Sequence, residues 1–449
     1  MRRGVRTREV ILLKVQIPIE SETLANGLRV IISPDHSAPV VSVGVYYEIG
    51  FRLEPQGRSG FAHLFEHMMF LGSEHVGKTE HIRLVTSAGG VLNGNTHYDV
   101  TSYFQAVPSN ALERILWLEA DRMRGLKFDE ENLRNERDVI KEEVRVSVLN
   151  RPYGSFPWLD LPPIAYRKWP NAHNFYGDFG DLDAATLDDL RQFFQAYYSP
   201  NNAVLLMVGD VDSLGLQAAR RYFEDIPPRE LPPPVDISEP PQHEERRGEV
   251  KEHFGHLLAL AIGHHVPDRH AKDWYAAGIL DGVVHGGRAG RVYRSLVLEK
   301  QIALKAGGGI HDPVGTLFDY NGPTLMVTRI FFKPEYSVDA MISAFDSVIR
   351  EVQERPLSNG ELEQVKAKFR GDYFSTLEAG MGSYMPHFGL MHALACFTLF
   401  DHDPQRVNHV LDGFLAVTPA EIQQLAQKIL TRENRAILVR RPQDNAARL

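Results

Sequence analysis

Two histidines and a glutamate lie close together in a short apolar segment, residues 61–70. His63 and His67 are four residues apart, so on a helix both imidazoles lie on one face, one turn from each other. That spacing suits two ligands of one metal ion. Glu66 lies between them, where its carboxylate could take a proton from a water on the metal without binding the metal itself. The alternative is a core helix whose histidines make ordinary hydrogen bonds, although burying these groups without a purpose is costly.

A second segment carries acidic residues that could lie beside such a site. A long helix is expected to begin near Asp129, and within it Glu136 and Glu143 are seven residues apart, two turns along one face. Apolar residues flank this pair: Val139, Ile140 and Val144. We therefore expect the Glu136/Glu143 face to lie near the buried side of the helix.

The bulk composition narrows the class of protein. A chain of 449 residues is too long for one core, so two or more domains are expected. Its 43% hydrophobic and 24% charged residues are ordinary for a globular protein, and a net charge of -9 argues against a nucleic-acid surface. Cys396 is the one cysteine, which excludes a disulfide within the chain and a zinc site made of several thiolates. We expect Cys396 to be a small core residue.

The N-terminal residues bear on localisation. Residues 1–9 are basic, and the apolar run 10–13 is too short for the core of a signal peptide. No apolar run reaches the length of a membrane span. We expect a soluble protein that is not bound to a membrane. The expected location is cytoplasmic, with a periplasmic location open if a signal lies upstream of this start.

The elements that must position these residues alternate along two halves of similar size. Strands are expected at 22–33 (with an Asn-Gly turn), 40–49, 99–107, 203–211 and 257–263. A segment with seven prolines, residues 227–248, is expected to be a rigid linker. The predicted domains are therefore an N-terminal αβ domain, residues 1–226, and a C-terminal αβ domain, residues 249–449.

The halves carry a repeated pattern. Residues 186–207, a capped helix, a turn and an apolar strand, parallel residues 418–439 at a constant offset of 232. The second half has no segment with the pattern His-x-x-Glu-His that residues 63–67 form. We therefore expect a second domain that repeats the first without its metal.

These segments together resemble a known family, the pitrilysin/insulinase peptidases, in the branch of mitochondrial processing peptidase and its short bacterial relatives. The matching stretches span nearly the whole chain in order, at residues 60–70, 89–96, 135–143, 198–203, 208–211 and 286–296. The resemblance implies an α+β fold of two homologous αβ halves. Each half would be an antiparallel-rich sheet flanked by helices, and together they would form one side of a clam-shell chamber.

The resemblance also implies a site, residue by residue. His63, His67 and Glu143 match the zinc ligands, one zinc ion per chain, and Glu66 matches the general base. Glu136 matches the carboxylate that completes the catalytic apparatus as a partner of a ligand histidine. Such a site implies a zinc-dependent endopeptidase that hydrolyses peptides or unfolded segments with a water that Glu66 activates.

Peptide substrates of this family bind extended, as an added strand at a sheet edge. The stretch that matches this edge is Val91, Leu92, Asn93, Gly94 and Asn95. Main-chain hydrogen bonds at such an edge give affinity with little preference for sequence. His97 and His173 are candidates to line the same cavity, whereas His264, His265 and His311 are expected to be surface or structural residues.

One departure bears on partners. Active members of the family carry an Arg and a Tyr seven residues apart in the second half, which hold the substrate, and here Val297 and Leu304 occupy those positions. Tyr293 and Arg294 nearby are out of register. We therefore expect a heterodimer, in which a related subunit without zinc supplies the Arg and the Tyr. A homodimeric peptidase and a non-catalytic core or scaffold subunit are the alternatives.

Overall fold

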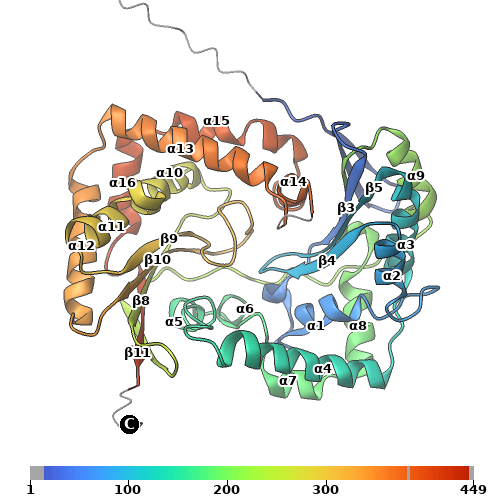
Figure 1. Cartoon of the computed structure of the whole chain (residues 1–449), viewed down its shortest axis with the longest axis horizontal. Helices are drawn as coiled ribbons and strands as arrows, with labels where there is room; N and C mark the ends of the chain where they lie inside the picture. Colours follow the sequence, from blue (N-terminus) through green and yellow to red (C-terminus); the bar gives the residue numbers. More distant parts are fainter. Residues whose placement is uncertain (1–14, 382–384, 444–449) are drawn as a thin grey trace, which may run out of the picture.

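The computed structural model describes residues 15–381 and 385–443, so the basic run 1–9 and the apolar run 10–13 lie outside the described residues. Within these ranges the strands form two mixed sheets with helices packed against them (Figure 1). The predicted α+β class with two αβ halves is confirmed. No helix in the described part of the chain is long and apolar enough to cross a bilayer.

The first sheet lies within residues 20–209 and has the strand order β1-β2-β6-β3-β5-β4. Its strands are β1 Glu20–Thr23, β2 Arg29–Pro34, β3 Val40–Tyr47, β4 Val91–Thr96, β5 Thr101–Pro108 and β6 Ala203–Gly209. The helices of this half are α1 Phe61–Met68, α2 Glu80–Ser87, α3 Leu112–Arg124, α4 Glu130–Val144, α5 Pro162–Ala165, α6 Trp169–Ala172, α7 Phe179–Ala184, α8 Leu187–Tyr197 and α9 Leu214–Phe223. Strands β2 and β6 pair in parallel and the other neighbours are antiparallel.

The second sheet has the strand order β7-β11-β8-β10-β9. Its strands are β7 Arg246–Glu252, β8 Leu258–His265, β9 Lys305–Ile310, β10 Leu325–Phe332 and β11 Arg435–Pro442. The helices of this half are α10 Trp274–His285, α11 Arg291–Tyr293, α12 Val338–Glu354, α13 Asn359–Glu378, α14 Phe388–Phe400, α15 Val410–Ala416 and α16 Pro419–Ile429. Strands β7 and β11 are the parallel pair.

The two sheets share one topology. Without β1, the first sheet reads β2-β6-β3-β5-β4, and strand by strand this is the order of the second sheet. The helices α8 and α16 lie 232 residues apart at both ends, and each begins with a capping box, at Thr186 with Asp189 and at Thr418 with Glu421. The repeated pattern in the sequence is therefore a repeated fold.

Each face of the first sheet packs against a different half of the chain. The alternation of side chains along β2 sends Val30 and Ile32 to one face and Ile31 to the other. The first face packs on α1, α3, α8 and α9. The opposite face packs on α14, a helix of the second half (Figure 1). There the Ser42 hydroxyl donates to Pro386 O at 2.7 Å.

The second sheet is covered in the same reciprocal way. One face packs on α10, α12 and α16 of its own half. The other face packs on residues from the first half, among them Phe156, Leu161 and Tyr166. Each half thus contributes a segment to the core of the other. Neither hydrophobic periodicity nor the proline-rich segment indicates this arrangement.

The proline-rich segment differs slightly from the prediction. It has no helix or strand from residue 227 to residue 245, but β7 already begins at Arg246, inside the predicted linker. We propose that, in sequence order, the chain consists of a domain 1–226, a linker 227–248 and a domain 249–449. The packing itself does not follow that division, because the cores are shared.

Candidate metal centre

Helix α1 is fixed at its start by a buried carboxylate. Glu54 accepts hydrogen bonds from Gly60 N at 2.8 Å and from Ala62 N at 2.6 Å, so it satisfies two of the free amide groups at the helix N-terminus. Gly60 has a φ of 85°, and a Cβ there would lie 2.6 Å from Tyr176 O. Burial of Phe61, among other apolar residues of α1, then holds the helix against the first sheet.

Three of the predicted residues converge. His63 Nε2 and His67 Nε2 each lie 3.6 Å from Glu143 Oε2, and the three ligand atoms lie within 4.8 Å of one another. These separations exceed the roughly 2.7–3.2 Å of a good hydrogen bond to oxygen. They are close to the separation of about 3.4 Å between two ligand atoms on a tetrahedral zinc ion. The donor set of two imidazoles and one carboxylate therefore fits zinc in type and in spacing.

Neighbouring groups hold the ligand atoms in these positions. Glu136 Oε2 lies 3.1 Å from His67 Nδ1, an arrangement that leaves His67 Nε2 free to face Glu143. The Tyr176 hydroxyl donates to Glu143 Oε1 at 3.1 Å, which leaves Oε2 toward the histidines. Glu136 therefore lies behind His67 and acts on the site through that histidine.

Helix α4 carries both glutamates on one face, as their spacing predicts. Asp129 caps the helix by accepting from Asn132 N, and Ile140 and Val144 are buried. Val139, however, is 49% exposed, so the expectation that it flanks the buried side is wrong. Ile140, by contrast, is buried and anchors the helix.

Burial and neighbouring charges shift the pKa values of the residues in the cluster in different directions. Burial and the nearby His67 lower the pKa of His63 to about 3. For His67, burial works in the same direction, but the nearby carboxylates of Glu136 and Glu143 outweigh it and raise the pKa to about 9. Burial also raises the pKa of Glu66. Burial thus keeps His63 neutral, the form that binds a metal ion, while Glu136 and Glu143 favour a positive charge on His67.

Glu66 lies between the ligand helix and strand β4. It is not among the converging ligand atoms, and its carboxylate is hydrogen-bonded with Thr96 at the end of β4. A Cβ built on Gly94 would lie 2.9 Å from Glu66 Cγ, so the strand and the glutamate are in close contact. The carboxylate is therefore held beside the metal site and beside a strand.

That strand is the predicted substrate edge. Val91, Leu92, Asn93, Gly94 and Asn95 all lie in β4, which pairs with β5 on one side and is the last strand in the order of its sheet. Asn93 Oδ1 accepts from Gly94 N at 2.9 Å. The side chain of Asn93 thus occupies a main-chain donor of β4 and has to turn away if a peptide uses that donor.

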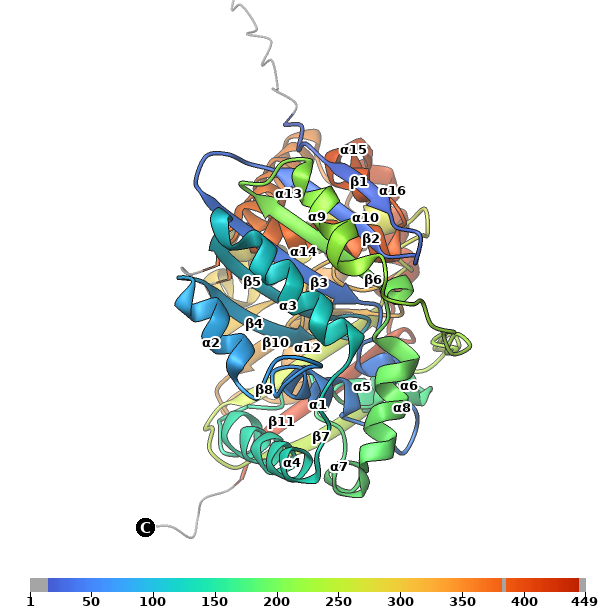
Figure 2. The ribbon, with the colours of Figure 1, turned by 90° about the vertical axis from the view of Figure 1, so that its right-hand side faces the viewer.

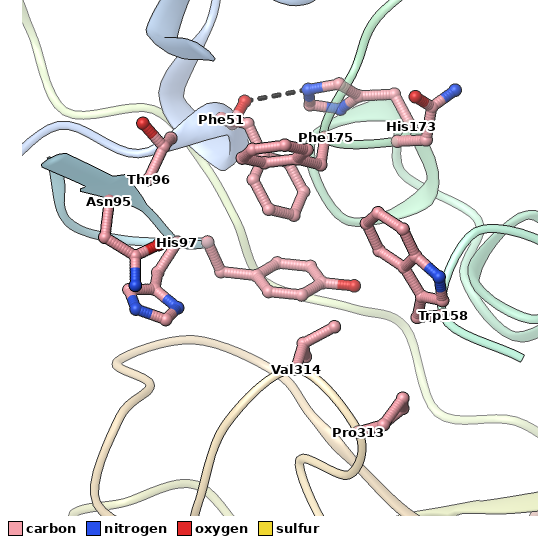
Figure 3. A pocket seen from close by; sticks show the side chains of 11 residues that line it. Phe51, Asn95, Thr96, His97, Trp158, His173, Phe175, Pro313 and Val314 are labelled. Atoms are coloured by element: carbon pink, nitrogen blue, oxygen red, sulfur yellow. Dashed lines mark hydrogen bonds between the residues drawn. The ribbon is translucent and has the colours of Figure 1, made fainter. Parts of the chain in front are cut away.

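A cavity of about 400 Å³ lies beside the metal site (Figure 3). Aromatic side chains form much of its wall, and residues of both halves contribute: Phe51, Asn95, Thr96, His97, Tyr98, Trp158, His173, Asn174, Phe175, Pro313 and Val314. The Phe175 ring lies 4.4 Å from the His63 ring, so the cavity adjoins the ligands. The prediction that His97 and His173 line the cavity is confirmed, and His173 also hydrogen-bonds Phe51 O at 2.7 Å.

The aromatic part of this wall is not indicated by any pattern in the sequence. Trp158 and Phe175 come from the loop-rich residues between α4 and α8, where no periodicity marks them. The one sign of them in the sequence is composition, because aromatic residues are frequent in this segment of short helices. Among the other histidines, His264 and His311 are buried and His311 hydrogen-bonds Thr324, in keeping with structural roles.

The two positions that depart from the family pattern carry no polar group. Val297 packs against the core of the second half, and Leu304, just before β9, is 54% exposed. Arg294 forms an ion pair with Glu299 at 3.4 Å. The side chains of Val297 and Leu304 cannot donate a hydrogen bond to a substrate.

Comparisons with known proteins agree with this geometry. Residues 29–153 match the model of the insulinase family, peptidase family M16, and residues 184–369 match the model of the M16 inactive domain. The chain is 30% identical over 368 residues to the zinc protease PqqE of Helicobacter pylori, with 80% of each chain covered. It is 29% identical to a probable mitochondrial-processing peptidase subunit beta of Arabidopsis thaliana, over 42% of this chain and 35% of that one.

Solved structures show the same likeness. The crystal structure of a protease from Helicobacter pylori superposes with a TM-score of 0.85 at 26% identity, covering 95% of this chain and 100% of that one. The matched regions contain α1, β4 and α4, the elements that hold the converging side chains. The chain therefore belongs to the insulinase family of peptidases, family M16.

Proposed function

We propose that the chain is a zinc-dependent endopeptidase that cleaves peptides or unfolded polypeptide segments. The observation that carries this proposal is the convergence of His63, His67 and Glu143, with Glu66 held between them and an open sheet edge. A scaffold protein would have no use for a carboxylate held beside such a ligand set. We propose one zinc ion at these three ligands.

The roles of the residues follow from their positions. A bound zinc ion would polarise a water molecule and the carbonyl group of the scissile bond. Glu66 would take the proton of that water and return it to the leaving nitrogen, a task suited to a carboxylate whose pKa burial has raised. Glu136 and Tyr176 hold His67 and Glu143 in place. Glu136 is thus a positioning residue.

We further propose that the substrate pairs with β4 and places one side chain in the aromatic cavity. An edge strand offers main-chain groups every second residue, so it binds an extended peptide whatever its sequence. The cavity wall at Asn95 and Thr96 is the continuation of β4, so a peptide on the strand reaches the cavity within a residue or two of Glu66. Its aromatic wall suits a large apolar side chain.

The proposed function also includes a partner subunit. Val297 and Leu304 give this chain no polar group where the family pattern has Arg and Tyr, so we propose that a related subunit supplies them. The match to a mitochondrial-processing peptidase subunit beta supports a two-subunit enzyme. A homodimer is the alternative, in which other residues hold the substrate.

The role of Glu66 is tested by Glu66→Gln, with Glu142→Gln as the matched control. Glu142 lies on α4 beside Glu143 but is exposed and pairs with Arg145. We expect Glu66→Gln to lower kcat on a fluorogenic peptide by about 10²- to 10⁴-fold with unchanged zinc content. Full activity in this variant would refute the role of Glu66.

The role of a partner is tested with the isolated chain and with the product of a neighbouring related gene. We expect the mixture to be far more active than either chain. A second variant, Val297→Arg with Leu304→Tyr, supplies the missing groups and is expected to raise the activity of the isolated chain. Equal activity with and without the partner would exclude the heterodimer and leave the peptidase itself in place.

A further inference from the structure

A second cluster of possible metal ligands lies outside the site described above. Asp319, His392 and Cys396 each offer one ligand atom, and these atoms lie within 4.8 Å of one another. His392 and Cys396 are one turn apart on α14, and Asp319 comes from the segment between β9 and β10. Cys396 is fully buried, while the side chains of Asp319 and His392 are each 12% exposed. The Asp319 carboxylate and the His392 imidazole are therefore open to an ion from solution.

The distances in this cluster fit the ligands of one metal ion, and the contact between His392 Nε2 and Cys396 Sγ is also a hydrogen bond. His392 Nε2 lies 3.4 Å from Asp319 Oδ1 and 3.7 Å from Cys396 Sγ. A nitrogen–oxygen hydrogen bond is shorter, about 2.7–3.2 Å. On a tetrahedral zinc ion, nitrogen and oxygen ligands lie about 3.4 Å apart, and nitrogen and sulfur ligands about 3.6 Å apart, from the usual bond lengths. The cluster thus has the spacing that the histidines and Glu143 show, with sulfur in place of one nitrogen.

Asp319 and His392 interact electrostatically within the cluster. For Asp319, burial raises the pKa, but His392 and His97 more than offset it and hold the pKa well below its usual range. For His392, burial lowers the pKa, but Cys396 and Asp319 reverse this and raise the pKa well above its usual range.

The position of the cluster gives such an ion a structural consequence. Helix α14 belongs to the second half but packs on the first sheet. The His392 ring lies 5.7 Å from the ring of Tyr46 on β3 and 5.5 Å from the ring of His97, which follows β4 and lines the cavity. An ion bound here would fix α14, the helix that packs on the first sheet, to the segment between β9 and β10.

We propose that Asp319, His392 and Cys396 form a second site for a thiophilic divalent transition metal, such as zinc, that ties α14 to the segment between β9 and β10. One thiolate, one imidazole and one carboxylate suit zinc and cobalt(II). Water would be the fourth ligand. This site uses none of the residues of the catalytic centre and does not depend on the proposed peptidase activity.

The single cysteine makes the test specific. Cobalt(II) bound to a thiolate has an intense charge-transfer band in the near ultraviolet, and Cys396 is the one thiol in the chain. We expect cobalt(II) titration of the metal-free full chain to show two ions per chain and this band. In His67→Ala we expect one ion and the band, and in Cys396→Ser one ion without it. Circular dichroism checks that each variant is folded.

The contribution of the other two ligands is measured in the same way. Asp319→Asn and His392→Gln are expected to weaken the thiolate-linked ion by about tenfold or more, since a lost ligand costs at least as much as a lost supporting contact. In His67→Ala, zinc should raise Tm, and in the double variant with Cys396→Ser it should not. One ion per folded native chain without the band would overturn the proposal. So would a band that appears only far above the concentration that fills the catalytic site, or one that Asp319→Asn leaves unchanged.

Discussion

The contact between β4 and Glu66 makes Gly94→Ala an informative substitution. A Cβ at position 94 would lie 2.9 Å from Glu66 Cγ and 3.3 Å from Phe70 Cε2. Carbon atoms normally approach to about 3.5–4.0 Å, so Glu66 has to move by roughly 0.6–1.1 Å. The added methyl group points toward α1, so the main-chain groups of β4 stay available to a peptide.

The expected cost follows from the displacement of the base. A misplacement of about 1 Å in a catalytic group costs up to roughly 100-fold in rate. We therefore expect kcat for a fluorogenic peptide to fall about 10- to 100-fold, which corresponds to about 1.4–2.7 kcal/mol in activation free energy. KM should change much less, and the zinc content should stay the same because the ligands are untouched.

The repeated fold offers a matched control. Gly307 lies in β9, the strand of the second sheet that corresponds to β4, and a Cβ there meets no atom within 4 Å. Gly307→Ala should leave kcat, KM and stability close to those of the native chain. A folded Gly94→Ala protein with native kcat would refute the reasoning, because Glu66 would then tolerate the displacement. A loss confined to KM would assign the role of Gly94 to substrate binding.

Three further predictions follow from the contacts around the site. Glu136→Gln should weaken zinc binding by about 10- to 100-fold in competition with a chelator, while kcat of the zinc-loaded enzyme changes little, because Glu136 acts through His67. Glu54→Gln should cost about 1–3 kcal/mol in urea unfolding at neutral pH, because an amide group would face one of the two N–H donors at the start of α1. Burial raises the pKa of Glu54, so the native carboxyl binds its proton more tightly than the unfolded one, and native stability falls as pH rises from the unfolded pKa through the native pKa. The variant should lack this slope, and an equal slope in both proteins would contradict the assignment. Phe175→Ala should reduce the preference for a large over a small apolar substrate residue by about tenfold in kcat/KM, and an unchanged ratio would separate the cavity from specificity.

Local patterns in the sequence go far toward the fold and the site. The i, i+4 spacing of His63 and His67 and the two-turn spacing of Glu136 and Glu143 give faces of helices, and helical geometry alone then sets which side chains can meet. The offset of 232 residues predicts the repeat, because the capped helix and apolar strand carry the same signals in both halves. These are short-range features, and they need no knowledge of what packs where.

The parts that sequence reasoning missed depend on long-range packing. Val139 looks like a buried neighbour of Ile140, but its exposure depends on which side of α4 meets α1. The aromatic wall formed by Trp158 and Phe175 comes from irregular segments, whose conformation follows from tertiary contacts. Cys396 was correctly predicted to be buried, but its position beside Asp319 follows from a segment 77 residues away, which no local pattern indicates.

The reciprocal packing of the two halves has a consequence for motion. Helix α14 fills the back of the first sheet, and residues around Phe156 and Leu161 fill the back of the second, so separating the halves would expose both cores to water. Such an opening costs nearly as much as unfolding, because the apolar surface that it exposes is the interior of the protein. The shared cores therefore hold the two halves of this chain together as one rigid unit. In the proposed two-subunit enzyme, a chamber that admits a peptide and closes on it would therefore open at the boundary between the two chains.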